Sequence, residues 1–256
     1  MAKKRSNNTL RPFLLLTLVA AGLFFAYLFY LWAVTPGPSS VRYEEFGISI
    51  PSRYEIHGID VSRYQQAVSW GLVKEMKVRN VQIGFAFIKA TEGSNLVDPL
   101  FKRNWKKAKE AGVTRGAYHF FNPRKDGKSQ AKRFLSTVKL ESGDLPPVLD
   151  IEKGWNLPKA KIQQEVKVWL DAVEAATGVK PIIYTYVTFY EKYLKGSFDD
   201  YPLWIAHYYQ PNSPRIKRSW QFWQHSEEGR VNGIRSKVDF NVFNGDSSDF
   251  RALLVP

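Results

Sequence analysis

The sequence contains no cysteine, and this absence excludes several kinds of site. A disulfide, a thiolate nucleophile and a zinc or iron centre held by cysteine are all impossible. Histidine is scarce as well: the chain has His57, His119, His207 and His225, and no two of them have the H-x-x-x-H spacing of a metal site. We therefore expect no metal and no cofactor, and we interpret His119 as a histidine satisfied in the core or at its rim.

Acidic residues are missing from the beginning of the chain, where none precedes Glu44, although Lys3, Lys4, Arg5 and Arg11 lie there. The formal net charge of the whole chain is +13 at pH 7. A basic protein attracts polyanions such as nucleic acid, anionic lipid or an acidic cell-wall polymer. The sequence has no helix-turn-helix, RNA-binding or zinc-finger pattern, so we expect no nucleic-acid partner.

The segment 13–34 has no charged residue. As a helix it would span roughly 33 Å, enough to cross the hydrocarbon core of a membrane. Its far end carries Tyr27, Tyr30 and Trp32, which favour the membrane interface. A cleaved signal peptide, the alternative, would have a shorter apolar core that ends in small residues. The basic flank predicts a cytoplasmic N-terminus, and we predict a single-pass membrane protein that is held in the membrane by this helix.

The composition changes after this segment, because Pro36, Gly37 and Pro38 begin a stretch typical of a linker. The predicted organisation is a cytoplasmic basic tail at 1–12, a transmembrane signal anchor at 13–34, a stem at 35–54 and a folded domain at 55–256. The folded domain would lie outside the cytoplasm, in a periplasm or at the cell surface.

Apolar strands and amphipathic stretches alternate through the folded domain. Strands are predicted at 56–61, 82–90, 114–120, 147–152, 181–187, 202–208, 220–224 and 237–242, and helices at 66–79, 98–111, 128–140, 158–177 and 188–195. Gly112 and Gly178 lie where helix C-caps are expected. This alternation predicts an α/β fold with parallel strands, and eight strands favour a closed barrel over an open doubly wound sheet.

Two carboxylates end the apolar run Val148-Leu149-Asp150-Ile151-Glu152. On a strand, Asp150 and Glu152 share one face, and burying either one unpaired is costly. Close carboxylates push each other's pKa apart, so one of them can stay protonated near neutral pH. Such a pair can cleave a glycosidic bond, although D-x-E alone is a weak motif.

Other acids are predicted to lie close to this pair. In a barrel the chemistry sits at the carboxyl ends of the strands, and the first strand ends at Asp60. Closure of the barrel places the first and eighth strands side by side, so Asp60 and Asp239 should be neighbours. We therefore expect acids from strands one, four and eight to meet at one mouth of the barrel.

Several blocks of the sequence occur together and in order: HGIDVSRYQ, FAFIKATEG, GAYHFF, PVLDIE, PIIYTYV, PLWIAHY, WQFWQHS and VDFNVFNG. In these blocks the chain resembles the glycoside hydrolase family 25 lysozymes, the Chalaropsis-type muramidases, over roughly 56–254. The resemblance implies a (β/α)5(β)3 TIM-like barrel, here preceded by one transmembrane helix. It also implies hydrolysis of the β-1,4 bond between N-acetylmuramic acid and N-acetylglucosamine, with the glycan strands of peptidoglycan as the partner.

The resemblance also implies roles for individual residues. Glu152 matches the general acid, Asp150 its partner, and Asp60 and Asp239 the remaining acids of the site. The positions that match the sugar-binding face are Lys89, Glu92, Tyr118, Tyr184, Trp204 and Gln224. The anchor and the lack of wall-binding repeats after the barrel favour remodelling of the wall near the membrane.

Two alternatives stay open. The domain could be a catalytically inactive, membrane-tethered peptidoglycan-binding module, since a fold does not fix a function. The presence of both Glu152 and Asp150 favours the enzyme. A hydrolase that uses the aspartates to hold a metal is the other alternative. Trp204 and Trp223 are each expected to lie half in the core and half under a sugar.

Overall fold

The computed structural model describes residues 10–34 and 39–256, with the side chains of 15–30 in the first range. The chain divides into two compact units, Met1–Ser39 and Ser40–Pro256. Most of the basic tail predicted at 1–12 and the beginning of the stem predicted at 35–54 lie outside the described residues.

The first unit contains one helix, α1 (Leu10–Val34). Within the residues that the structure describes, no helix is long and apolar enough to cross a membrane, so the transmembrane helix predicted at 13–34 is not supported.

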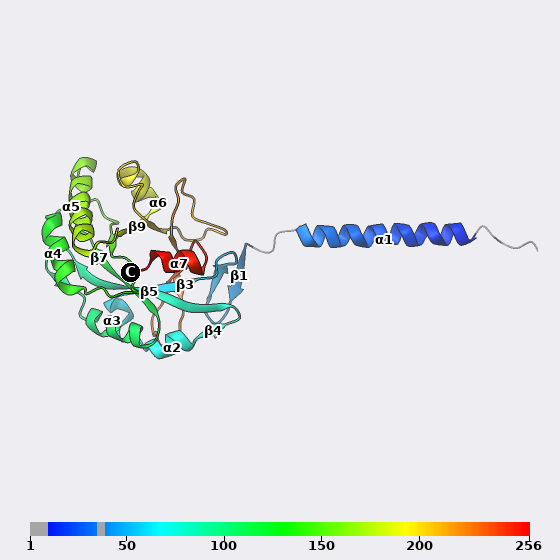
Figure 1. Ribbon diagram of the computed structural model, residues 1–256, viewed down its shortest axis with the longest axis horizontal. Helices are drawn as coiled ribbons and strands as arrows, with labels where there is room; N and C mark the ends of the chain where they lie inside the picture. Colours follow the sequence, from blue (N-terminus) through cyan, green and yellow to red (C-terminus); the bar gives the residue numbers. More distant parts are fainter. Residues whose placement is uncertain (1–9, 35–38) are drawn as a thin grey trace, which may run out of the picture. The chain divides into compact units, whose positions relative to one another are not determined.

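The second unit is built on eight strands that close into a barrel-like sheet (Figure 1). The strands are β3 (His57–Val61), β5 (Val81–Glu92), β7 (Thr114–Phe120), β8 (Val148–Asp150), β9 (Ile182–Tyr186), β10 (Leu203–Ala206), β11 (Phe222–Gly229) and β12 (Val238–Phe243). The sheet closes because β3 pairs with both β5 and β12. The prediction of a mixed α/β fold around an eight-stranded closed sheet is confirmed.

The direction of the last strand decides where its residues lie. Neighbouring strands from β3 through β11 run parallel, but β12 runs antiparallel to both β11 and β3. The beginning of β12 therefore meets the carboxyl ends of the other strands. Asp239, the second residue of β12, stands opposite Asp60 in the register.

Helices follow the first five barrel strands and lie on the outside of the sheet (Figure 1). They are α2 (Trp70–Glu75), α3 (Phe101–Glu110), α4 (Gly127–Thr137), α5 (Lys159–Thr177), and α6 (Val187–Phe189) with the π-helical turn η2 (Tyr190–Leu194). A 3-10 turn, η1 (Arg63–Gln65), precedes α2, and α7 (Ser247–Leu253) follows the barrel. Gly112 and Gly178 have left-handed φ angles of 71° and 69° just after α3 and at the end of α5, as helix ends require.

The helix predicted at 66–79 is much shorter in the structure. Gln66 has a φ of 56°, which is outside the helical region, and Met76 is extended. The next residues form β4 (Lys77–Val78), which pairs with the beginning of β5, and β6 (Leu96–Val97) pairs with the end of β5. The last residues of the predicted helix thus form a strand instead, because they pair with β5.

An N-terminal hairpin, β1 (Ser40–Tyr43) with β2 (Ile48–Pro51), belongs to the second unit. Its Phe46 has no exposed surface and packs on Phe240 with ring centroids 5.2 Å apart. Arg230 N–H donates to the Phe46 carbonyl over 2.9 Å. The compact unit begins at Ser40, whereas 35–54 was predicted as a linker; apolar side chains packed on β12 account for the difference.

Below the mouth, aromatic side chains fill the barrel. Phe87 stacks on Trp204 with centroids 4.3 Å apart, and Phe85 packs edge-on against Phe87 and Phe222. Gly58 of β3 makes room for this packing, because a Cβ at that position would lie 2.4 Å from the Phe85 ring. The interior is a packed floor on which the polar groups of the mouth rest.

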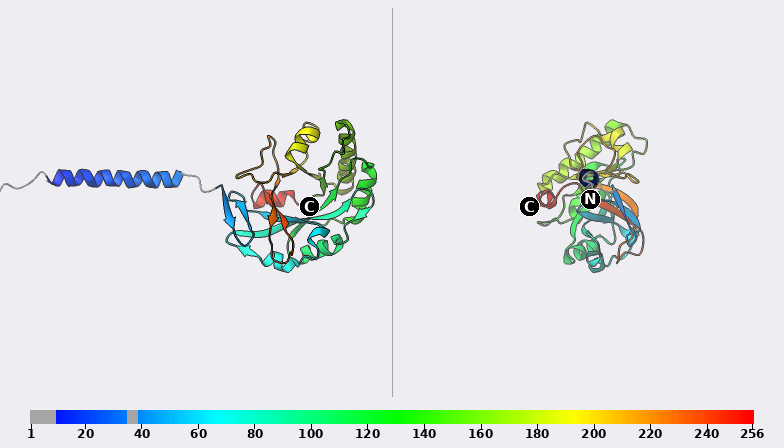
Figure 2. Two further views of the ribbon diagram at one scale, coloured as in Figure 1. Left: turned by 180° about the vertical axis from the view of Figure 1, so that it is seen from behind. Right: turned by 90° about the vertical axis from the view of Figure 1, so that its right-hand side faces the viewer.

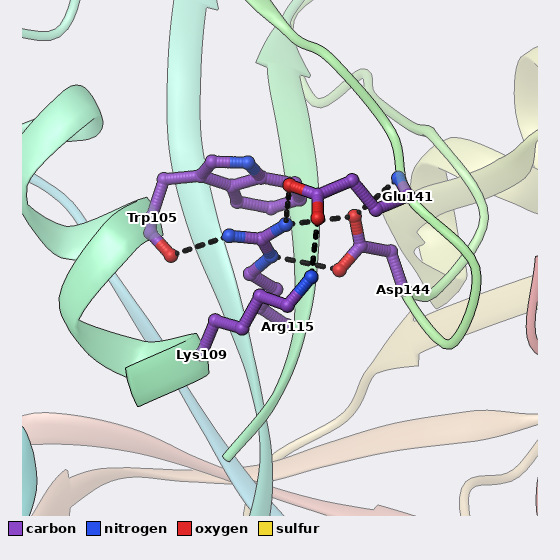
Figure 3. Close-up of polar contacts among 5 residues, drawn as sticks. All are labelled: Trp105, Lys109, Arg115, Glu141 and Asp144. Carbon is purple, nitrogen blue, oxygen red and sulfur yellow. Dashed lines mark hydrogen bonds and ion pairs between the residues drawn. The ribbon is translucent and has the colours of Figure 1, made fainter. Parts of the chain in front are cut away.

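A buried ion-pair cluster fixes the amino end of β7 (Figure 3). Arg115 is 3% exposed; its Nε donates to Asp144 Oδ1 over 2.7 Å, and a terminal nitrogen donates to Glu141 Oε1 over 2.9 Å. The guanidinium also lies 4.0 Å from the Trp105 ring centroid and donates to the Trp105 carbonyl. Lys109 pairs with the same glutamate. The cluster holds the segment that leads into β8, the strand that carries Asp150.

Candidate active site

The carboxyl ends of the barrel strands surround a cavity of about 270 Å³. All the acids expected at the mouth line it, from β3, from β8 and the residues after it, and from β12. Nine of the ten predicted site residues line this cavity: Asp60, Lys89, Tyr118, Asp150, Glu152, Tyr184, Trp204, Gln224 and Asp239. Glu92, the tenth, lies beside it and accepts a hydrogen bond from Lys89 Nζ over 2.7 Å. The structure therefore brings the predicted residues together; their roles stay predictions.

Asp60 and Asp239 form a hydrogen-bonded carboxyl pair. Burial raises the pKa of Asp60 to about 6 and that of Asp239 to about 9, and the charge of Asp60 adds to the second shift. At neutral pH Asp239 therefore keeps its proton and donates to the Asp60 carboxylate. The two residues are neighbours, as the predicted closure of the barrel required.

Two side-chain amides keep Asp60 more acidic than Asp239. Gln224 Nε2 and Asn241 Nδ2 each donate to Asp60 Oδ2 over 2.8 Å. These donors stabilise the ionised carboxylate and partly oppose the effect of burial on its pKa. Asp60 is consequently the carboxylate of the pair that carries the charge.

The amides are themselves fixed by aromatic side chains. The hydroxyls of Tyr184 and Tyr208 donate to Gln224 Oε1 over 2.8 and 2.7 Å. Trp204 Nε1 donates to Asn241 Oδ1 over 2.8 Å. Each amide then has only its nitrogen left to face Asp60, so the network fixes which atom points at the carboxylate.

Asp150 and Glu152 line the same cavity, although β8 ends at Asp150, so the strand predicted at 147–152 is shorter and Glu152 follows it. Burial raises the pKa of Asp150 well above the ordinary aspartate value, and the charge of Glu152 raises it further. Burial also raises the pKa of Glu152, against the opposing effect of the nearby Tyr184 hydroxyl. Burial is the main cause of both shifts, and the repulsion that the sequence predicted acts mostly on Asp150, the more deeply buried of the two.

Asp150 Oδ1 is buried and has no hydrogen-bond partner within the described residues. A buried acceptor without a partner is costly unless something fills the site. Lys89 opposes the shift, because its positive charge lowers the pKa of both Asp150 and Glu152. The Lys89 ammonium also lies 4.6 Å from the Phe120 ring centroid. The site is thus a cluster of carboxyl groups whose charge Lys89 and, at Glu152, also Lys153 compensate in part.

Comparison with known proteins agrees with this geometry. The model of the glycosyl hydrolases of family 25 matches residues 59–234. This chain belongs to that family. The family 25 chain is 48% identical to the uncharacterized protein YegX of Escherichia coli (strain K12) over 211 residues, which are 82% of this chain and 78% of YegX.

A lysozyme and a solved structure are also similar to this family 25 chain. It is 36% identical to Lysozyme M1 of Streptomyces globisporus over 214 residues, 77% of this chain and 71% of that protein. Its fold matches the structure of a family 25 glycosyl hydrolase from Bacillus anthracis with a TM-score of 0.73 at 33% identity, over 83% of this chain and 99% of that one. The prediction of a glycoside hydrolase of the lysozyme type is confirmed.

The tryptophans of the family 25 domain lie deeper than expected. Trp204 is 1% exposed, and its ring packs between Phe87 and Tyr184 at the floor of the cavity. Trp223 has no exposed surface and donates its indole N–H to the His207 carbonyl. Both belong to the core, and Trp223 does not line the cavity at the barrel mouth.

His119 lies in the core, as the sequence predicted. Its Nδ1 lies 2.7 Å from Thr91 Oγ1, its Nε2 lies 3.2 Å from Gln130 Oε1, and its ring stacks on Trp169. Burial lowers the pKa of His119 to about 3, so the ring is neutral at ordinary pH. In the part of the chain that the structure describes, no cluster of three or more histidine or acidic side chains is placed to hold a metal ion.

Several residues of the site were not predicted. Val61, Ser62, Tyr64, Gln65, Phe120, Tyr208 and Glu227 line the cavity, and Asn241 bonds to Asp60. Asn241 lies two residues after Asp239 on the same strand, and this spacing could have indicated a shared face. Glu227 lines the cavity because β11 continues to Gly229, beyond the end predicted at 224. Tyr208 lies in the connection after β10, and nothing in the local pattern indicates its contact with Gln224.

Proposed function

We propose that this family 25 enzyme hydrolyses the β-1,4 bond between N-acetylmuramic acid and N-acetylglucosamine in peptidoglycan. The observation that carries the proposal is the cavity at the barrel mouth, where Asp60, Asp150, Glu152 and Asp239 converge and all have raised pKa values. Glycosidic cleavage needs one carboxyl group that holds a proton near neutral pH and another that carries charge.

Glu152 is the proposed general acid. It lines the cavity but is less buried than Asp150, so a glycosidic oxygen can reach it. Its raised pKa favours the protonated form that the reaction requires at the start.

Asp150 is proposed to position the acetamido group of the substrate. Its buried Oδ1 lacks a partner, and an acetamido N–H can supply the missing hydrogen bond. That bond favours the ionised form of Asp150. Because Asp150 and Glu152 repel each other when both are charged, the shared proton then stays on Glu152. Substrate binding would thus place the proton on the residue that must donate it.

Positioned in this way, the acetamido oxygen can attack the neighbouring anomeric carbon, as in substrate-assisted glycosidases. A covalent intermediate on an aspartate and direct attack by water are the two competing mechanisms. Asp60 and Asp239 would complete the site as a pair that shares one proton and keeps one negative charge in the cavity.

The remaining residues are proposed to bind the sugars. Lys89, Tyr118 and Gln224 lie at the cavity wall, and the buried rings of Tyr184 and Trp204 form its floor. Glu92 would act through Lys89, whose ammonium it fixes. Aromatic faces and polar tips together suit a sugar ring.

Incubation with purified peptidoglycan and mass analysis of the released fragments test this function. Muramidase activity would release fragments that end in reducing N-acetylmuramic acid. Glu152→Gln should fold normally and lose activity by about 10²–10⁴-fold, because it cannot give up a proton. Glu110→Gln, on the exposed face of α3, is the matched control and should stay active. Binding of glycan without release of any fragment by the wild-type protein would favour the inactive binding module.

We further propose that the domain acts outside the cytoplasm, where peptidoglycan lies, and that the segment 13–34 retains it at the membrane. The support is in the sequence alone: an uncharged segment follows Lys3, Lys4, Arg5 and Arg11. Protease added to spheroplasts should digest the domain. Protection until the membrane is broken would contradict the proposal, and a mature protein that lacks this segment would show that it is cleaved.

A further inference from the structure

A second cavity, of about 550 Å³, adjoins the catalytic one. Tyr208 and Glu227 line both cavities, so the two lie next to each other. The other walls come from the hairpin β1–β2, from the residues after Tyr208 and from the end of β11. Figures 1 and 2 show the connection between β10 and β11 projecting beyond the sheet on the same side as α6.

The hairpin wall lies outside the part of the chain that matches the family, which begins at residue 59. The contacts of Phe46 with Phe240 and Arg230 hold the hairpin on the barrel. The opposite wall is held too, because the Tyr54 hydroxyl donates to the Asn212 carbonyl over 3.1 Å and Gln210 Nε2 donates to the Tyr208 carbonyl. The second cavity therefore has fixed walls on both sides.

Two residues that line the second cavity each have one buried polar atom without a hydrogen-bond partner in the described residues. These atoms are His225 Nε2 and Gln210 Oε1. His225 is 6% exposed and lies where the pairing of β11 with β12 is irregular. Such groups are stabilised when a ligand supplies the missing hydrogen bond. A hydroxyl group can donate and accept, so it can satisfy either kind of atom.

At the rim of this cavity Tyr209 is 85% exposed, and its φ is 58°. A left-handed conformation is uncommon for a residue with a large side chain, and it occurs often at binding sites. An exposed ring beside polar groups is the arrangement on which a sugar ring stacks.

We propose that this second cavity is an additional saccharide-binding subsite, which takes sugar units of the same glycan strand beyond those at the catalytic carboxyl groups. The proposal rests on the proposed function. Tyr209 would stack on a sugar, and His225 and Gln210 would bond its hydroxyl groups. The hairpin β1–β2 thereby lengthens the glycan cleft of this enzyme.

The charges favour the glycan over the stem peptides of peptidoglycan, which carry carboxylates. Arg42 is the cation at this cavity, and it pairs with Glu44 at 3.3 Å. Glu228 pairs with Lys237, while Glu227 adds a negative charge to the wall. Among the described residues that line this cavity, no positive side chain is therefore left unpaired to bind a carboxylate of a stem peptide.

The test compares peptide-free glycans of two lengths, a tetrasaccharide and a dodecasaccharide, as substrates of the full-length protein. Tyr209→Ala should raise KM for the long glycan by about 2- to 10-fold, which corresponds to the loss of one stacking contact. The kcat on both glycans and the KM for the tetrasaccharide should not change. Tyr209→Phe keeps the ring and should behave as the wild type, and Arg251→Ala, on α7, serves as the surface control.

Three results would overturn the subsite. They are equal effects on both lengths, no effect on either, and an effect confined to glycans that still carry stem peptides. If the wild-type protein cleaves neither glycan, the proposed function fails instead. The subsite is then judged from equilibrium binding of the same glycans by calorimetry: weaker binding of the long glycan alone by Tyr209→Ala supports it, and equal binding by both proteins refutes it.

Discussion

Replacement of Asp239 by asparagine should stabilise the fold at neutral pH while it damages the catalytic site. Asp239 has a pKa of about 9 in the folded protein, against an ordinary value of 3.8. Between these pH values the unfolded chain releases the proton that the folded protein keeps. The contribution of Asp239 to the stability of the folded protein is therefore fully present below pH 3.8 and is lost as the pH rises toward 9.

The size of the effect follows from this shift. At pH 7 the pH lies about 3 units above the ordinary pKa, and about 1.4 kcal/mol per unit gives a cost on the order of 4 kcal/mol. Asparagine has no ionised form and keeps an N–H that can donate to Asp60. An imperfect replacement of that hydrogen bond costs about 1 kcal/mol. The expected gain in the free energy of unfolding is about 3 kcal/mol at pH 7 and less than about 1 kcal/mol at pH 5.

Urea unfolding followed by tryptophan fluorescence measures this gain at pH 5, 6, 7 and 8. Asp171→Asn, on the exposed face of α5, is the control and should change the free energy of unfolding by less than about 1 kcal/mol at every pH. The decisive observation is that the gain for Asp239→Asn grows with pH. A loss of stability at pH 7, or a gain that is the same from pH 5 to pH 8, would refute the assignment of the proton to Asp239.

Three further outcomes are expected. Arg115→Met leaves Asp144 buried without its partner and should lower the free energy of unfolding by about 3–5 kcal/mol in urea; a loss below about 1 kcal/mol, similar to that of the exposed Lys167→Met, would count against the buried cluster. Asn241→Leu removes one donor from Asp60, so the pKa of Asp60 should rise and the acidic limb of the pH profile of kcat/KM should move up by about one pH unit or more; an unmoved limb would separate Asp60 from that limb. NMR of the first-formed product should show retention of the anomeric configuration, as the acetamido mechanism requires, and an inverted product would eliminate it.

The barrel and the gathering of its acids could be predicted because both depend on local patterns. Alternating strands and helices indicated the closed sheet, and its closure implied that Asp60 and Asp239 are neighbours. The direction of β12 did not follow from the pattern in the same way. Asp239 was expected at the end of a strand, but it lies near the beginning of an antiparallel one. It reaches the mouth because the last strand reverses.

The hydrogen-bond network of the site could not be predicted, because its partners are far apart in the sequence. Asp60 receives its hydrogen bonds from residues 164 and 181 positions later. No pattern of propensity or spacing links such positions; the packing of the barrel brings them together. The hairpin was missed for a related reason. Its prolines and glycine indicated a linker, while the surface that buries Phe46 belongs to β12.

The seam between β3 and β12 also determines when this enzyme acquires its active site. A ribosome delivers the chain from its N-terminus, so Asp60, Asp150 and Glu152 emerge long before Asp239 and Asn241. Until β12 is made, Asp60 lacks both its carboxyl partner and one of its amide donors. A nascent or prematurely terminated chain that stops before residue 238 would therefore lack the complete carboxyl cluster of the proposed site, which forms only when translation is nearly finished.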